Sequence, residues 1–265
     1  MVKTLLLQIV TSVFLIFSLT ASAYSEDFEG LKLAADNGNA NAQFRLGQYY
    51  EQGVQMFPKD LSQAAKWYAK ASEKEHVSAT NHLAVMYYNG LGELKKDAVK
   101  AKALFEKSIE KKDSLAMFML GTIYMEGPPG IERNLNKGID LIKTAAEYGN
   151  AMAQNELGVM YYNGNEFIKR DRGKAYMWYK KGAVTGNINA QIHLGTMLYY
   201  GIAPVEKDKD KAVEWMSKAA DKGNETAYNW LVKWSDGKTK SRTITVEMIK
   251  GERGTKPVLK PELKE

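Results

Sequence analysis

Residues 153–164 read Ala153-Gln-Asn-Glu-Leu-Gly-Val-Met-Tyr161-Tyr-Asn-Gly164, and this pattern returns every 37 residues along the chain. Small, large and aromatic residues stand 0, 4, 5 and 8 residues after Ala153, a spacing that places them in one apolar stripe on a helix. A glycine follows 11 residues after Ala153, where it can end the helix because glycine adopts positive φ without strain. A fixed period between about 20 and 50 residues is typical of stacked supersecondary units. The stretch therefore predicts a repeat array.

Five complete repeats align on one alanine each, and we number positions within a repeat from that alanine, which is Ala42, Ala79, Ala116, Ala153 or Ala190. Position 11 is always glycine: Gly53, Gly90, Gly127, Gly164 and Gly201. Position 5 is always small: Gly47, Ala84, Gly121, Gly158 and Gly195. Because no large side chain fills the space at position 5, we expect two helix backbones to approach closely there.

The second half of each repeat predicts another helix, as in Arg170-Asp-Arg-Gly-Lys-Ala175-Tyr-Met-Trp178-Tyr-Lys-Lys181. It opens at position 18 on an N-cap residue: Asp60, Asp97, Asn134, Asp171 or Asp208. Each repeat is thus an antiparallel helical hairpin, and hairpins of this kind bury their faces by stacking. Residues 28–38 match only a second helix and residues 227–234 only a first helix, as capping half-repeats would. About eleven helices are expected over residues 28–236.

The two quoted strings resemble Sel1-like repeats, an α/α solenoid family related to tetratricopeptide repeats. The resemblance covers residues 28–236 and implies an all-α fold, a right-handed superhelix of five hairpin repeats with half-repeat caps. Members of this family are typically adaptors that bind other proteins, and some exported bacterial members resemble immunity proteins that neutralise secreted toxins or lipases. Cysteine-rich members are reported to bind or hydrolyse β-lactams. This chain has no cysteine, so it departs from that group.

The first 23 residues resemble a secretory signal peptide. Lys3 is their only charge, residues 5–19 form an apolar run, and Ala21-Ser22-Ala23 offers a small-x-small cleavage site. We expect residues 1–23 to be removed, residues 24–237 to form the repeat solenoid and residues 238–265 to be a basic tail. The protein would then be periplasmic or secreted, without stable membrane insertion. An uncleaved anchor is the alternative, because residues 4–23 are just long enough to cross a bilayer.

The charge of the chain is concentrated in its tail. The net charge is +6, of which residues 238–265 hold eight Lys or Arg against four Glu, and Lys3 adds one more. The solenoid is therefore about +1 and lacks the basic stripe that nucleic-acid binding requires. Residues 242–249 suit a short extended segment and residues 250–265 a loose end. The tail is read either as a solvated end or as an anchor to anionic lipid or an acidic partner.

Few residues point to catalysis or to a metal or cofactor site. His82 and His193 share position 3 but lie three repeats apart, so they cannot share a metal ion, and His76 stands elsewhere. We expect isolated surface or inter-helix histidines. The acids at position 18 are explained as helix caps. Trp67, Trp178 and Trp215 recur at the apolar stripe, which favours core packing. We therefore expect no catalytic residue, metal site or cofactor.

A binding face is predicted on the first helices, at the positions that the apolar stripe leaves free. In superhelical hairpin arrays the first helices generally line the concave surface. Aromatic, methionine and amide side chains at positions 2 and 9 suit protein recognition better than a solvated helix face would. The candidates are Phe44, Asn81, Tyr88, Phe118, Met125, Asn155, Tyr162, Ile192 and Tyr199. The alternative is that some of them pack against the adjacent repeat.

Two function classes follow from this composition. The first is an exported scaffold that binds another protein, in a narrower form an immunity partner of a secreted toxin or lipase. The second is a cell-envelope enzyme, such as a β-lactam or cell-wall hydrolase. The sequence favours the scaffold, because it offers a recognition surface and no reactive constellation.

Overall fold

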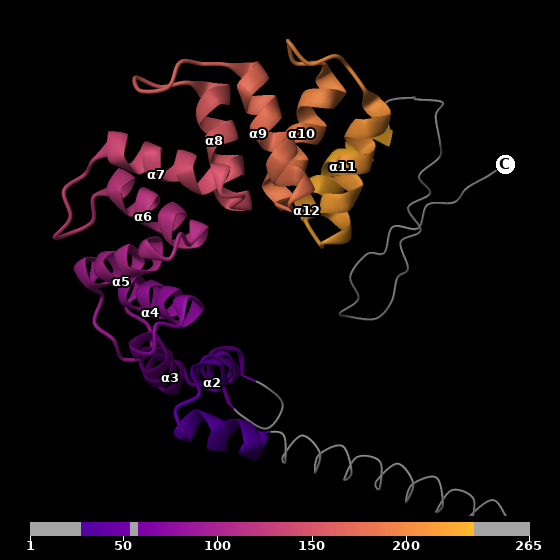
Figure 1. Ribbon diagram of the computed structural model, residues 1–265. Coiled ribbons are helices and arrows are strands. Elements are labelled where there is room, and N and C mark those ends of the chain that lie inside the picture. Colours follow the sequence, from indigo (N-terminus) through magenta and orange to yellow (C-terminus); the bar gives the residue numbers. More distant parts are fainter. Residues whose placement is uncertain (1–27, 54–57, 236–265) are drawn as a thin grey trace, which may run out of the picture. The chain divides into compact units, whose positions relative to one another are not determined.

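The computed structural model describes residues 28–53 and 58–235, which are helical with short connections (Figure 1). Residues 28–36 form a first helix, and no β-strand occurs in the described ranges. The helices that follow are α2 (Ala40–Gln52), α3 (Leu61–Glu73), α4 (Val77–Asn89), α5 (Ala98–Glu110), α6 (Ser114–Glu126), α7 (Leu135–Glu147), α8 (Ala151–Asn163), α9 (Arg172–Val184), α10 (Ile188–Tyr200), α11 (Lys209–Asp221) and α12 (Glu225–Ser235). The predicted all-α solenoid is confirmed. The expected cleavable segment and basic tail lie outside the described residues.

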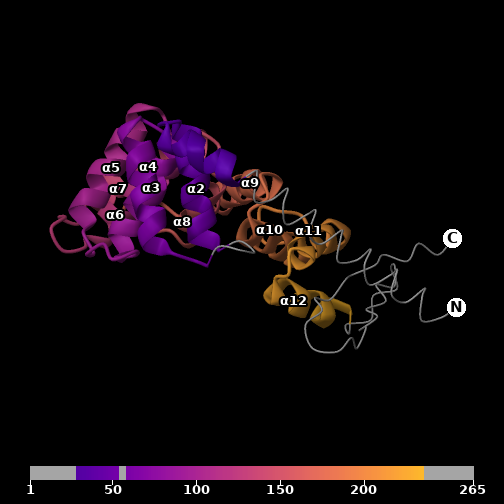
Figure 2. The same ribbon diagram turned by 90° about the horizontal axis from the view of Figure 1, so that it is seen from below.

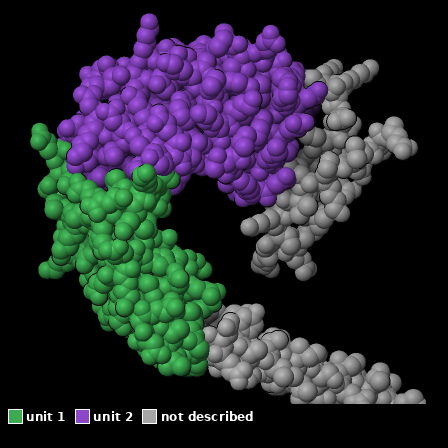
Figure 3. Space-filling model, viewed as in Figure 1, with its two compact units in different colours: residues 1–116, 128–132 green, residues 117–127, 133–265 purple. Residues whose placement is uncertain are grey.

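The helices fall into two compact units (Figure 3). Of the described residues, unit 1 holds 28–53, 58–116 and 128–132, and unit 2 holds 117–127 and 133–235. Helices α2 to α5 belong to unit 1, and α7 to α12 belong to unit 2 together with most of α6. Within a unit, the two helices of a hairpin lie side by side, as α4 and α5 do in unit 1 and α10 and α11 in unit 2 (Figures 1 and 2).

Half-repeats cover both ends of the array as predicted. Phe28 and Ala35 of the first helix share a buried cluster with Ala42, Leu46 and Trp67 of unit 1. At the other end, α12 contributes buried residues Ala227, Leu231 and Trp234 to the core of unit 2. Each terminal half-repeat therefore shields an apolar face that would otherwise meet water.

The predicted helix boundaries are set by recurring caps. The glycine at position 11 has positive φ in all five repeats, between 64° and 72°. At position 18 each Asp or Asn side chain accepts a hydrogen bond from the backbone N–H three residues on, at 2.9 Å. The backbone N–H of the same residue donates to the carbonyl of position 8, at 2.8 or 2.9 Å. The acids at position 18 are structural, as the sequence indicated.

A second series of caps, which sequence reasoning missed, begins the first helices. Each cap side chain stands three residues before the repeat alanine and accepts from its N–H: Asn39, His76, Asp113, Asn150, Asn187 and Asn224. Asparagine, histidine and aspartate all occur at this position, so no single residue type marks it in the sequence. His76 is thus a helix cap through Nδ1, 3.2 Å from the Ala79 nitrogen. Its ring also stacks on Phe44 of α2, with centroids 4.6 Å apart, so it is an inter-helix histidine, one of the two settings expected for it.

The small residue at position 5 makes room for the partner helix, but the contact differs among repeats. A Cβ placed on Gly158 would lie 2.5 Å from Cδ1 of Tyr179, and one on Gly47 would lie 2.6 Å from Cε1 of Tyr68. On Gly195 the nearest atom would be the backbone oxygen of Ala212, at 3.1 Å. At Gly47 and Gly158 the nearest atoms of the partner helix belong to a tyrosine ring, which fills the space that the glycine leaves.

Glutamines at position 1 join consecutive hairpins. The Nε2 atoms of Gln43, Gln154 and Gln191 donate to backbone oxygens eight residues earlier, at 2.9, 3.1 and 3.1 Å. Those oxygens belong to the last turns of the preceding second helices. Because the three glutamines are buried, these bonds fix the angle at which one hairpin follows another.

The tryptophans of the second helices are less uniformly buried than predicted. Trp67 is buried, but Trp178 and Trp215 are half-buried. In each case a lysine three residues on places its Nζ over the ring, 4.0 to 4.2 Å from the centroid. The lysine shields one ring face from water, so half-burial is tolerated there.

Candidate functional site

The nine residues of the predicted binding face divide between the two units. Phe44, Asn81 and Tyr88 lie in unit 1. The other six lie in unit 2: Phe118, Met125, Asn155, Tyr162, Ile192 and Tyr199. Asn81 is buried and the other eight are half-buried. None of the nine therefore lies on a fully solvated helix face.

Phe44 packs against the following repeat. Its ring centroid lies 4.6 Å from that of His76, 5.6 Å from that of His82 and 5.8 Å from that of Tyr68. These contacts fill the space between α2, α3 and α4. Phe44 is therefore mainly a packing residue between helices, and only the edge of that contact is accessible to a partner.

Asn81 supports the next helix start. Only 2% of Asn81 is exposed, and its Nδ2 donates to Oδ1 of Asp113 at 2.8 Å. The same Asp113 oxygen caps α6 by accepting from Ala116. Asn81 therefore holds a cap in place and offers almost no surface to a partner, which corrects its assignment to the accessible face.

In unit 2, Tyr162, Ile192 and Tyr199 pack along the edge of the buried core. Tyr199 also stacks on Trp234 of the terminal helix, with centroids 4.0 Å apart and planes 3° apart. Met125 lies over Gly138 of α7, where an added Cβ would be 2.5 Å from its Cγ. Asn155 keeps a buried Oδ1 that has no hydrogen-bond partner within the described residues.

The position-9 tyrosines share one feature that the sequence did not reveal. A basic side chain lies over each ring: Lys96 over Tyr88 at 5.8 Å, Arg172 over Tyr162 at 5.7 Å, and Lys209 over Tyr199 at 5.2 Å. These cations come from the loop or first turn that follows the same helix. Each tyrosine therefore presents an aromatic surface next to a positive charge, a combination that favours protein recognition.

A polar cluster in unit 1 was also missed. Oε2 of Glu51 lies 3.0 Å from Nδ1 of His82 and accepts a hydrogen bond from the Tyr68 hydroxyl at 2.5 Å. The rings of Tyr68 and His82 are 4.8 Å apart. Burial, and then the bond to Glu51, raises the pKa of Tyr68 above its usual range. His82 is thus an inter-helix histidine, one of the two settings that the sequence predicted for it.

Unit 2 repeats part of this cluster three repeats later. Tyr179 and His193 occupy the positions of Tyr68 and His82, and their rings are also 4.8 Å apart. Burial lowers the pKa of His193 and raises that of Glu156. Tyr162 replaces Glu51 at position 9, so the carboxylate partner of the histidine is lost. The shared Tyr–His stack is therefore a packing device between repeats.

Residues 28–53 and 58–235 contain no group of three or more His, Cys, Asp or Glu side chains placed to hold a metal ion. No helix in those ranges combines the length and the apolar character needed to cross a membrane.

Comparison with known proteins agrees with this architecture. The Sel1 repeat model matches residues 40–76, 77–113, 114–150, 151–183 and 188–224. A Sel1 repeat protein structure from Oxalobacter formigenes is 29% identical, with a TM-score of 0.70, over 79% of this chain and 59% of that one. An immunity protein from Pseudomonas aeruginosa is 23% identical, with a TM-score of 0.53, over 71% of this chain and 67% of that one. The latter likeness concerns the fold alone.

A curated plant protein matches a shorter segment. The ERAD-associated E3 ubiquitin-protein ligase component HRD3A of Arabidopsis thaliana is 39% identical over 49 residues. That segment is 18% of this chain and 7% of the plant protein. The chain thus spans 59% of the Oxalobacter protein and a small fraction of HRD3A.

Proposed function

We propose that this chain, which belongs to the Sel1 repeat family, is a scaffold that binds another protein. The observation that carries the proposal is the presence of half-buried tyrosines at position 9, Tyr88 and Tyr162, each with a basic side chain over its ring. Tyrosine and arginine are enriched at the energetic centres of protein interfaces, because they bury large areas and keep hydrogen-bonding groups.

The accessible part of the proposed surface is smaller than the sequence suggested. Asn81 is buried and Tyr199 is stacked on the terminal helix, so neither is assigned a direct contact. Tyr88, Phe118 and Tyr162 remain as aromatic anchors. Tyr162 is the strongest of these, because its ring lies beside Arg172.

Export forms the second part of the proposal. It rests on the order of charge, apolar run and small residues over residues 1–23. The protein would meet its partner in the periplasm or outside the cell. A narrower form makes the chain an immunity partner that neutralises a secreted toxin or lipase, a role that immunity proteins of the same fold suggest.

Site-specific crosslinking tests the proposed surface. A photoreactive phenylalanine analogue would replace Tyr162, and in a matched protein it would replace Tyr148, which is 54% exposed and outside the nine candidates. We expect one discrete protein to be crosslinked in the periplasm or medium from position 162 and not from position 148. Equal crosslinking from both positions would contradict the proposal. Identification of the partner as a toxin or lipase, followed by an inhibition assay, would test the narrower form.

A further inference from the structure

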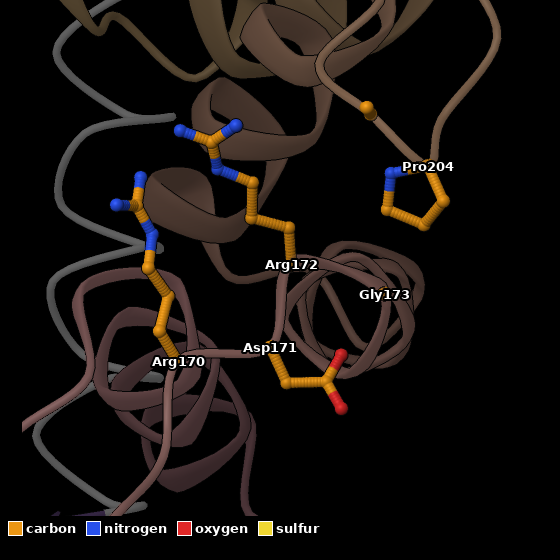
Figure 4. Close-up of a pocket in the computed structure, with 6 residues that line it drawn as sticks. Arg170, Asp171, Arg172, Gly173 and Pro204 are labelled. Atoms are coloured by element: carbon orange, nitrogen blue, oxygen red, sulfur yellow. The ribbon is translucent and has the colours of Figure 1, made fainter.

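A shallow pocket opens in unit 2 where two successive inter-helix loops meet. Arg170 and Asp171 come from the loop before α9, Arg172 and Gly173 come from the first turn of α9, and Ala203 and Pro204 come from the loop after α10. Its volume is 380 Å³. Figure 4 shows both arginine side chains extending to the same side of the chain, whereas the Asp171 carboxylate points the opposite way.

The arginines of this pocket have no anionic partner within the described residues. Neither guanidinium forms an ion pair there. The neighbouring Asp171 is already engaged, because its carboxylate accepts from the Lys174 N–H at 2.9 Å and lies 3.9 Å from the Lys174 ammonium. The Nε atom of Arg172 is buried and lacks a hydrogen-bond acceptor. Two guanidinium groups thus line the pocket, and the one carboxylate in its lining, that of Asp171, is paired with Lys174.

Arg172 lies next to the candidate binding surface. Its guanidinium carbon lies 5.7 Å from the centroid of the Tyr162 ring. Arg172 is also specific to this repeat, since the corresponding residues elsewhere are Leu61, Ala98, Leu135 and Lys209. Position 17, by contrast, is basic in every repeat: Lys59, Lys96, Arg133, Arg170 and Lys207. Positions 17 and 19 are therefore both basic in this repeat and in the fifth, which has Lys207 and Lys209, but only this repeat has two arginines there.

A carboxylate is the ligand that this arrangement fits. The planar guanidinium presents parallel N–H donors that match the two oxygens of a carboxylate. Ala203 and Pro204 add an apolar wall that suits the aliphatic part of an acidic side chain. We propose that the Arg170–Arg172 pocket binds a glutamate or aspartate side chain from an acidic segment of the protein partner. This inference rests on the proposed function and assigns the chemistry of the partner.

Titration of the mature chain with defined probes tests this assignment. The probes are a capped tetraglutamate peptide, the corresponding tetraglutamine peptide and inorganic phosphate. NMR of the arginine Nε–H signals reports the contact directly. We expect the Arg172 signal to shift with tetraglutamate and to stay in place with tetraglutamine. Phosphate that shifts the signal at the same concentration would overturn the proposal in favour of a free small anion.

Three variants locate the binding and control for net charge. R170Q/R172Q should weaken tetraglutamate binding about tenfold or more, as loss of a charge-assisted pair implies. K59Q/K95Q removes the same charge from exposed sites of unit 1 and should change binding less than about twofold. Gly173→Val keeps both arginines but fills the pocket, since a Cβ there meets Pro204 at 3.4 Å without a clash. It should weaken binding as R170Q/R172Q does.

The outcomes separate this inference from the proposed function. An equal loss in K59Q/K95Q would reveal general electrostatic attraction and overturn the pocket assignment. Unchanged binding in Gly173→Val would also overturn it. If the analogue at position 162 crosslinks a partner while tetraglutamate does not shift the Arg172 signal, the scaffold function is supported and the carboxylate pocket is refuted. If tetraglutamate binds as described but crosslinking finds no partner, the scaffold function falls.

Discussion

The imidazole of His76 accepts a hydrogen bond from the Ala79 amide at 3.2 Å, where each of the five equivalent caps uses an asparagine or aspartate oxygen. Only the neutral imidazole can accept this bond at Nδ1. Burial lowers the pKa of His76 below its ordinary value of 6.5. The helix cap of α4 is therefore sensitive to protonation.

His76→Asn is expected to reduce the pH dependence of stability. Because the folded-state pKa of His76 is lowered, the unfolded chain binds more protons as the pH falls below about 6.5. Stability is thus lost as the pH falls through that window. Asparagine keeps the cap without titrating, so the variant should match the wild type at pH 7.5 and unfold at higher urea concentration at pH 5.5. His193, whose pKa is also lowered, is present in both proteins, so its contribution to the pH dependence cancels in the comparison. An unchanged pH slope would contradict the role of His76.

Gly158→Leu is expected to destabilise unit 2 by about 1–3 kcal/mol or more, because overpacking displaces neighbouring side chains. Even a Cβ at this position would overlap the Tyr179 ring. Thermal unfolding followed by circular dichroism measures the effect. Gly30→Ala is the matched control, because no atom lies within 4 Å of its Cβ position and the residue is helical. The control should be neutral or slightly stabilising. Equal melting temperatures for Gly158→Leu and the wild type would refute the contact.

Glu51→Ala is expected to cost about 1–3 kcal/mol, because it leaves the Tyr68 hydroxyl without its acceptor. Tyr68→Phe should cost less, since the buried ring remains. In the double variant the two effects should be less than additive, with a coupling of about 0.5–3 kcal/mol. Urea unfolding of the four proteins completes the cycle. Strict additivity would mean that the Glu51–Tyr68 bond contributes nothing to stability.

Replacing Tyr88, Phe118 and Tyr162 together by alanine is expected to weaken partner binding by about 1–4 kcal/mol for each residue that is a true hot spot. All three side chains are half-buried, so helicity should be retained. Calorimetry with the identified partner measures affinity, and circular dichroism checks the fold. Deleting residues 250–265 should have a smaller effect. A folded triple variant with normal affinity would assign binding to another surface.

The mature protein is expected to begin at Tyr24, after the Ala21-Ser22-Ala23 site. Mass spectrometry of the protein from the periplasm or medium measures this end directly. Intact Met1 in a membrane fraction would indicate an uncleaved anchor. Ala23→Arg should block cleavage if the small residue is what the peptidase requires.

The repeats made the fold readable from the sequence, because five copies of each boundary residue reinforce one another. The acids at position 18 and the glycines at position 11 were assigned correctly for this reason. The contact of Asn81 with Asp113 was not predictable, since it depends on how one hairpin follows the next. Position 2 faces the adjacent repeat at Phe44 and Asn81, and no periodicity argument within one helix reveals that.

The Arg170–Arg172 pocket escaped prediction for a related reason. Its residues come from two loops about one repeat apart, and only packing brings Pro204 beside Gly173. The net charge of the solenoid, about +1, also gave no sign of the pocket, because summing charges over all repeats does not show where two arginines lie close together. Sequence reasoning identified Tyr162 but not the cation that lies over its ring.

The glutamine bonds between hairpins also bear on how such an array changes over generations. Asn150 and Asn187 are equivalent caps, and Gln154 and Gln191 each reach a carbonyl eight residues back. Unequal recombination that removes or duplicates one period between them therefore rebuilds the same cap and the same inter-hairpin bond at the new junction. The lineage can lengthen or shorten its array in single steps without inventing an interface. A residue that occurs in one repeat only, such as Arg172, would be gained or lost together with its whole repeat.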